Sequence, residues 1–73
     1  MERPLDALNA AKGKKVIVEL KDKSAYIGTL EAFDIHINLV LDETEHRVDG
    51  EVKRKLGRVL IRGDSVIIVS PAE

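Results

Sequence analysis

The sequence predicts a small, mainly β domain in which one short N-terminal helix precedes a strongly bent, five-stranded antiparallel sheet or barrel. From Lys15 onwards, apolar residues recur with a period of two, which is the period of a strand with one buried face. Short polar or glycine-containing turns separate the apolar runs. Gly28 lies inside one run, where a glycine indicates a sharp bend or a close approach of backbone. A strand bent at this point can serve both sides of a small barrel.

The helix is expected at residues 4–12. Pro4 suits the first helical position, where its missing N–H has no intrahelical partner to lose. Leu5 and Leu8 lie one turn apart on a narrow apolar stripe, and Gly13 is a suitable stop. A helix this short is not stable alone, so we expect it to pack on one end of the barrel.

Five strands are expected after the helix. The segment 43–55 carries dense mixed charge around Gly50, which predicts a solvated loop or an extended hairpin rather than part of the core. Pro71 is expected to end the sheet, because proline has no N–H to donate to a neighbouring strand. The predicted strands span residues 15–20, 25–33, 38–42, 56–62 and 66–70.

The last two predicted strands are apolar on both faces, at Val59–Ile61 and at Val66–Val69. Such a strand is buried on both sides or lies at an interface, and a single small sheet offers little room for the first arrangement. An exposed apolar edge also promotes aggregation unless another chain covers it. Pairing the fourth strand of one copy with the fifth strand of the next resolves both problems. That contact is head-to-tail, so it produces either a ring or a filament.

Size and composition also favour self-assembly. A chain of 73 residues forms one domain, and domains this small usually need a disulfide, a metal or a partner chain for stability. There is no cysteine, and the two histidines, His36 and His46, cannot form a structural zinc site by themselves. We therefore expect no metal and no cofactor, which leaves oligomerisation as the source of added stability.

Charge and aromatic content restrict the ways in which the chain can bind nucleic acid. The net charge is −1, so any positive charge that meets RNA must be local. Tyr26 and Phe33 are the only aromatic residues, which argues against the stacking platforms of RRM and OB domains. The start of the chain does not resemble a signal peptide, and no apolar run approaches the roughly 20 residues that span a bilayer. A soluble cytoplasmic protein without membrane association is expected.

Two segments carry a resemblance to a known family. Residues 26–41 read YIGTLEAFDIHINLVL and resemble the first Sm motif, and residues 60–66 read LIRGDSV and resemble the second. The N-terminal sequence RPLD at residues 3–6 is similar to the start of archaeal Sm-like proteins. The second motif has Arg-Gly-Asp in place of the lysine–histidine pattern of the bacterial Sm-like RNA chaperone. The resemblance covers almost the whole chain and points to the archaeal and eukaryotic branch.

This resemblance implies one Sm-like domain over residues 1–73, with an SH3-like, Sm-fold barrel. Its parts are the helix at 4–12, the first motif within 15–42, the charged loop at 43–55 and the second motif within 56–70. The family implies a homo-oligomeric ring, mostly of seven subunits, that binds uridine-rich single-stranded RNA as a chaperone or scaffold in RNA processing. RNA-processing proteins are further possible partners.

Six residues are the candidate RNA-binding site: Asp34, His36, Asn38, Arg62, Gly63 and Asp64. The Asn38 amide has a donor beside an acceptor, which matches the N–H and carbonyl on the pairing edge of uracil. A flipped amide suits cytosine equally, so discrimination needs a group that fixes the amide, and Asp34 is placed to accept from its NH2 end. His36 and Arg62 offer flat surfaces for stacking on a base. The resemblance implies that their two loops line the central hole together.

Gly63 and Asp64 complete the candidate site. Gly63 is expected to permit a turn that a side chain would block. Asp64 either orients Arg62 or accepts a hydrogen bond from a base or a ribose, and the sequence leaves both roles open. In isolation, Asn38 would be interpreted as an ordinary turn residue and Arg62 as a member of a surface ion pair. The joint presence of these residues inside the two motifs favours RNA binding.

Other functions are less well supported by the residues. No serine, threonine or cysteine accompanies a histidine and an acid, and there is no glycine-rich phosphate loop, so we expect a binding module rather than an enzyme. The main alternative is a ring of the same barrel that acts as a scaffold for proteins and binds little RNA. The basic cluster Lys53–Lys55 shares its segment with several acidic residues and is interpreted as solvated surface. His46, in the same segment, is not expected to bind a ligand.

Overall fold

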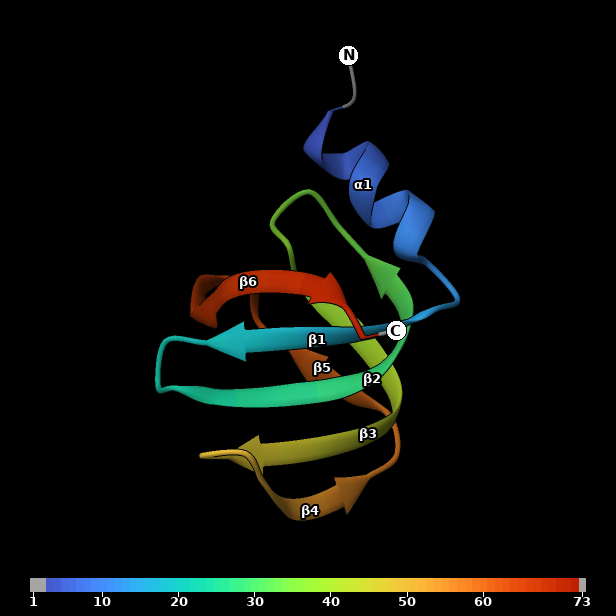
Figure 1. Cartoon of the computed structure of the whole chain (residues 1–73). Coiled ribbons are helices and arrows are strands. Elements are labelled where there is room, and N and C mark those ends of the chain that lie inside the picture. The colour runs from blue at the N-terminus through green and yellow to red at the C-terminus, as the bar shows by residue number, and fades with distance from the viewer. Residues whose placement is uncertain (1–2, 73) are drawn as a thin grey trace.

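The computed structural model describes residues 3–72 and is built mainly of β-strands, with one N-terminal helix (Figure 1). The fold class predicted from the sequence is confirmed. The element bounds are α1 Pro4–Ala11, β1 Lys15–Leu20, β2 Ser24–Phe33, β3 Leu39–Val48, β4 Glu51–Leu56, β5 Val59–Ile61, the 3-10 turn η1 Gly63–Ser65 and β6 Val66–Pro71.

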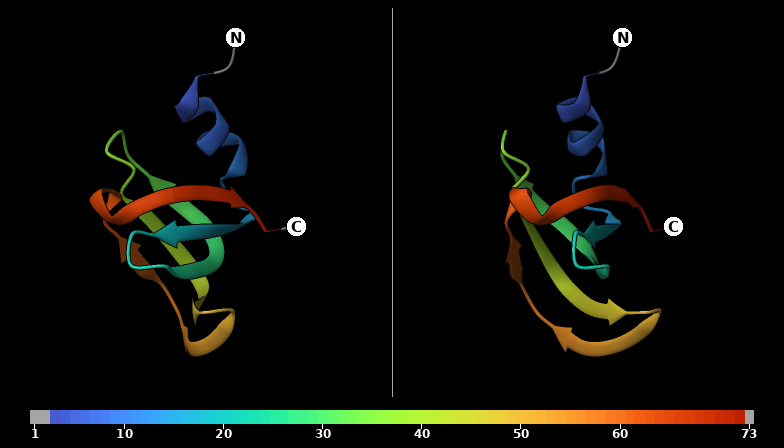
Figure 2. Two further views of the ribbon diagram at one scale, coloured as in Figure 1. Left: turned by 60° about the vertical axis from the view of Figure 1, so that its left-hand side comes forward. Right: turned by 90° about the vertical axis from the view of Figure 1, so that its left-hand side faces the viewer.

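The strands form one antiparallel sheet in the order β4-β3-β2-β1-β6, and β5 pairs with β3 outside this path. The sheet bends so strongly that it curls into an open barrel (Figure 2). The β2–β3 register shifts between Ile27 and Thr29, around Gly28. A Cβ atom at Gly28 would lie 2.8 Å from the carbonyl oxygen of Asp42. The absence of a side chain at Gly28 therefore permits both the bend of β2 and the close approach of the β3 backbone.

The charged segment 43–55 adopts the second of its two expected forms, an extended hairpin of β3 and β4. The predicted third strand therefore runs on to Val48, beyond its expected end at residue 42. Charged side chains persist in these strands because they lie opposite one another in the ladder, as Glu45 does with Lys55. The hairpin projects from the end of the barrel opposite α1 (Figure 1).

The predicted fourth strand, 56–62, is the second boundary that differs. Within it only Val59–Ile61 forms a strand, β5, because residues 57–58 form a bend and Leu56 is the last residue of β4. β4 and β5 pair with different parts of β3, which bends between them: Leu39–Leu41 pairs with β5, and Thr44–Val48 pairs with β4.

A small apolar core fills the barrel, and α1 lies against one of its ends. No residue of α1 is fully buried, and Leu8 and Ala11 are the helix residues that pack against the core. The chain leaves the helix through Gly13, whose φ of 84° lies in the left-handed region that glycine adopts without a steric penalty. No helix within residues 3–72 has the length and apolar character needed to cross a membrane. The buried apolar residues are Val16, Val18, Leu30, Leu39, Leu41 and Ile61.

The two strands predicted to be apolar on both faces leave the barrel open. β5 pairs only with β3 and β6 only with β1, so each has one edge without a partner in the described chain. Leu60 on β5 is 68% exposed, and Ile67 and Ile68 on β6 are 61% and 49% exposed. The isolated chain therefore presents apolar side chains along two unpaired strand edges.

Candidate nucleic-acid interface

The turn between β2 and β3 is organised by the carboxylate of Asp34. Its Oδ1 accepts hydrogen bonds from the backbone N–H groups of His36 at 2.9 Å and Asn38 at 3.1 Å. Its Oδ2 accepts from the Nδ2 of Asn38 at 3.0 Å. An aspartate commonly stabilises a tight turn in this way, by accepting from backbone groups a few residues ahead. The turn rises at the same end of the barrel as α1 (Figure 1).

The other end of the Asn38 amide is held by the second motif. Its Oδ1 accepts a hydrogen bond from the backbone N–H of Gly63 at 2.8 Å, across 25 residues of sequence. The amide orientation is therefore fixed at both ends, by an acceptor that faces Nδ2 and a donor that faces Oδ1. One N–H of Nδ2 and one lone pair of Oδ1 remain free, so the side chain offers a donor beside an acceptor.

Gly63 brings the two loops together. A Cβ atom at this position would lie 1.8 Å from the carbonyl oxygen of His36 and 2.9 Å from the carbonyl carbon of Ile37. The sequence predicted that Gly63 permits a turn that a side chain would block, and these distances agree, although Gly63 is not among the residues with a positive φ. The requirement for glycine comes from the neighbouring backbone, which leaves no space for a side chain.

Arg62 and Asp64 form an exposed ion pair beside this contact. The Nη2 of Arg62 lies 3.1 Å from the Oδ2 of Asp64, and the two side chains are 80% and 66% exposed. Such a pair stabilises a protein by about 1 kcal/mol or less, so a bound base or phosphate can compete for the guanidinium. The His36 side chain is also exposed. The structure thus places all six candidate residues in two adjoining segments, and the stacking roles of His36 and Arg62 stay predictions.

Hydrogen bonds hold the pKa of the Asp34 carboxyl below its ordinary value of 3.8. The largest cause is the bond from the Asn38 side chain, followed by the bond from the Asn38 backbone N–H, while burial opposes both. Because the pKa is lowered in the folded chain, the stabilisation by the carboxylate is present above the unfolded pKa. It is lost as the pH falls through the lower, folded pKa. The acceptor that fixes the amide is therefore ionised throughout the neutral and mildly acidic range.

This effect predicts a specific change in a carboxyl titration. In wild-type protein, the side-chain carbon of Asp34 should titrate by NMR with a midpoint below 3.8. In Asn38→Ala the midpoint should rise, because the largest cause of the lowered pKa is removed. Asp22, whose pKa is lowered mainly by Ser24, serves as the internal control and should not move. An Asp34 midpoint that is identical in both proteins would contradict this account.

Two further features, one in this turn and one in the β2–β3 ladder away from it, were not predicted from the sequence. Ile37, inside the Asp34–Asn38 turn, has a φ of 61°, a conformation that β-branched residues rarely adopt. His46, which was predicted not to bind a ligand, stacks on Tyr26 across β2 and β3 with ring centroids 4.5 Å apart and planes inclined by 19°. Neither feature could be predicted from the residue types and their spacing. Both arise from strand register and the path of a turn.

Comparisons with known proteins agree with this geometry. A snRNP Sm-like protein of Methanococcoides burtonii is 55% identical over 69 residues, which cover 94% of this chain and 96% of that protein. The Sm protein of Pyrococcus abyssi, solved in complex with a uridine heptamer, superposes with a TM-score of 0.94 at 44% identity. That match covers 97% of this chain and all of the other.

A second solved structure and a family model extend the agreement. The SmAP1 heptamer of Pyrobaculum aerophilum gives a TM-score of 0.91 at 36% identity, covering 100% of this chain and 97% of that one. The model of the LSM domain matches residues 6–71, which include most of α1, every strand and both loops of the candidate site. The chain therefore belongs to the LSM domain family.

Proposed function

We propose that the protein binds uridine-rich single-stranded RNA as a homo-oligomeric ring and acts as a chaperone or scaffold in RNA processing. The observation that carries this proposal is the Asn38 amide, which is held at both ends while one donor and one acceptor stay free. The solved relatives support it, since one is bound to a uridine heptamer and another is a heptamer.

The fixed amide explains a preference for uridine over cytidine. Uracil presents an N–H to the free lone pair of Oδ1 and a carbonyl oxygen to the free N–H of Nδ2. Cytosine presents the reverse pattern, so the amide would have to flip. A flipped Asn38 would direct its oxygen at the Asp34 carboxylate and its NH2 at the Gly63 N–H, and both hydrogen bonds would be lost. A two-bond contact of this kind is worth about 1–3 kcal/mol of base discrimination in DNA recognition.

Base stacking and the repetition of identical binding slots around the ring supply the affinity for RNA. His36 and Arg62 stack on the flat face of any base, with contributions of roughly 1–3 kcal/mol per base. A ring presents identical slots to a single strand, and linked binding raises overall affinity by roughly 10²–10⁴ without new contacts. Recognition therefore combines an unselective stacking contribution with a selective contribution from the amide.

The ring itself is supported by the two unpaired edges. The β5 edge of one copy can pair with the β6 edge of the next, which covers Leu60 and Ile67 and completes each barrel across the subunit boundary. A subunit number of seven rests on the family. A scaffold that binds only proteins would have no need for an amide fixed between two loops. A binding role without catalysis and a cytoplasmic location stay predictions from the sequence.

Replacing Asn38 tests the proposed function. In Asn38→Ala, the ratio of oligouridine to oligocytidine affinity should fall by roughly 5- to 150-fold, which corresponds to about 1–3 kcal/mol. His36→Ala is the matched control, because loss of stacking should weaken both ligands by a similar factor. Competition binding measured by fluorescence anisotropy gives both ratios. An Asn38→Ala protein with the full uridine preference would contradict the assignment.

A further inference from the structure

Ile37 holds a backbone conformation that needs support from its surroundings. Its φ of 61° places Cβ close to the following carbonyl group, and branching at Cβ increases the crowding. Such a residue persists only where neighbouring contacts determine the path of the chain. The backbone supplies one of them, since the N–H of Ile37 donates to the carbonyl oxygen of Asp34 at 3.1 Å.

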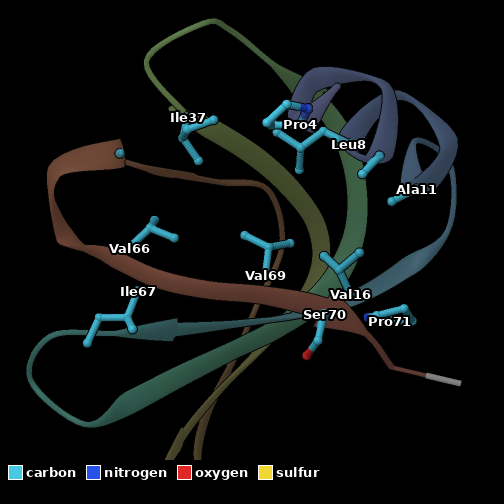
Figure 3. Close-up of a pocket in the computed structure, with 12 residues that line it drawn as sticks. Pro4, Leu8, Ala11, Val16, Ile37, Val66, Ile67, Val69, Ser70 and Pro71 are labelled. Atoms are coloured by element: carbon cyan, nitrogen blue, oxygen red, sulfur yellow. The ribbon is translucent and has the colours of Figure 1, made fainter. Parts of the chain in front are cut away.

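The Ile37 side chain supplies a second constraint, because it packs against the apolar core. It lines an apolar cavity of about 490 Å³ between α1 and β6 (Figure 3). In this view Ile37 stands at the cavity with Pro4 and Leu8 of the helix on one side and Val66 of β6 on another. Ile37 is half-buried and packs against the core, whereas the side chain of the neighbouring Ile35 is 73% exposed. Ile37 is therefore the apolar anchor of the turn that contains the candidate site.

The anchor is connected directly to the Asn38 amide. Ile37 precedes Asn38 in the chain, and its carbonyl carbon borders the position where Gly63 lacks a side chain. The N–H of that glycine donates to Asn38 Oδ1. Loss of the Ile37 side-chain contact would therefore release the backbone that sets both the amide and its donor.

We propose that Ile37 is a positioning residue through which α1 holds the Asn38 amide in its uridine-reading orientation. This inference rests on the proposed function and deepens it. The helix has eight residues and none is fully buried, so its place on the barrel depends on its few apolar contacts. Leu8 and Ile37 both pack against the core and line the same cavity, so the helix can support the turn through the core although none of the six candidate residues belongs to it.

Two pairs of variants distinguish the effect of the Ile37 side-chain packing from the effect of its strained backbone conformation. Ile37→Leu keeps the apolar volume and moves the branch away from Cβ, so it should preserve the site. Ile37→Gly adopts a positive φ readily but has no side chain in the cavity, so it should loosen the site. On the helix, Leu8→Ala shortens a side chain that lines the cavity and packs against the core. Leu5→Ala makes the same chemical change at a side chain that does not line the cavity and is 37% exposed.

The first readout needs no RNA. Hydrogen exchange of the Gly63 backbone N–H, followed by NMR on the assembled protein, reports the bond to Asn38. Exchange should accelerate by about tenfold or more in Ile37→Gly and Leu8→Ala, and should stay within about twofold of wild type in Ile37→Leu and Leu5→Ala. The second readout is the ratio of oligouridine to oligocytidine affinity, which should fall by roughly fivefold in the first two variants only.

The outcomes separate this inference from the proposed function. Unchanged exchange in Leu8→Ala, or wild-type exchange and preference in Ile37→Gly, would overturn the positioning role, because the backbone conformation alone would then suffice. A wild-type protein without uridine preference would overturn the proposed function. The positioning role would still be supported if the exchange rates separated the variants as expected.

Discussion

Gly63→Ala is expected to reduce oligouridine affinity by about 100-fold or more, because one added methyl group disturbs both loops of the site. The new Cβ would lie 1.8 Å from the His36 carbonyl oxygen, a distance that only a movement of backbone can relieve. Separation of the two segments breaks the bond from the Gly63 N–H to Asn38. It also moves His36 away from Arg62, so the stacking and selective contributions are lost together.

Gly57→Ala is the matched control for this substitution. A Cβ at Gly57 meets no atom within 4 Å, and Gly57 has no positive φ. Its replacement should leave RNA binding unchanged and raise stability by about 0.4–1 kcal/mol through the lower entropy of the unfolded chain. Fluorescence anisotropy with oligouridine and thermal unfolding measure both effects. Wild-type affinity in Gly63→Ala would show that the contact between the loops is not needed for binding.

A glutamate at either unpaired edge is expected to convert the assembled protein into monomers. Leu60→Glu alters the β5 edge and Ile67→Glu the β6 edge, and both side chains are exposed in the single chain. Burial of an unpaired carboxylate in an apolar contact costs several kcal/mol, and a ring repeats that cost at every subunit boundary. Sedimentation velocity at micromolar concentration should show the full assembly for wild type and one subunit for each variant.

The head-to-tail arrangement adds a sharper test. A mixture of Leu60→Glu and Ile67→Glu should form a two-chain complex, because the intact β6 of the first can pair with the intact β5 of the second. Val52→Glu is the control, since Val52 is 46% exposed but lies in the β3–β4 hairpin and should not affect assembly. A wild-type protein that sediments as a monomer, or a mixture that stays monomeric, would exclude the proposed contact.

Local patterns accounted for much of the fold and part of the site. The period of two, the turn residues and Gly28 predicted the strands, and the spacing of Asp34 and Asn38 predicted the bond to the NH2 end of the amide, which is present at 3.0 Å. The sequence did not decide between a loop and a hairpin at 43–55. Every residue of β4 from Glu51 to Lys55 is exposed, and a strand without a buried face does not need the alternation of apolar and polar residues by which strands are predicted.

The remaining part of the site depends on contacts that no local pattern encodes. The donor to Asn38 Oδ1 is a backbone N–H 25 residues away, and the pairing of β3 with β5 brings it to the amide. The left-handed turn at Ile37 opposes the preference of its residue type, so the sequence pattern argues against it. Such features follow from tertiary packing and become visible only in three dimensions.

The Gly63 N–H that fixes the amide is an uncharged backbone group, and this has a consequence for how the protein responds to ionic strength. Contacts between Arg62 and phosphate weaken as salt rises, because the gain from released counterions becomes smaller. The hydrogen bonds between the Asn38 amide and a base also join neutral groups, and such bonds are far less sensitive to added ions; the charged Asp34 carboxylate acts on the amide only at short range. How tightly RNA is held will therefore vary with the ionic conditions, while the choice of base stays nearly constant.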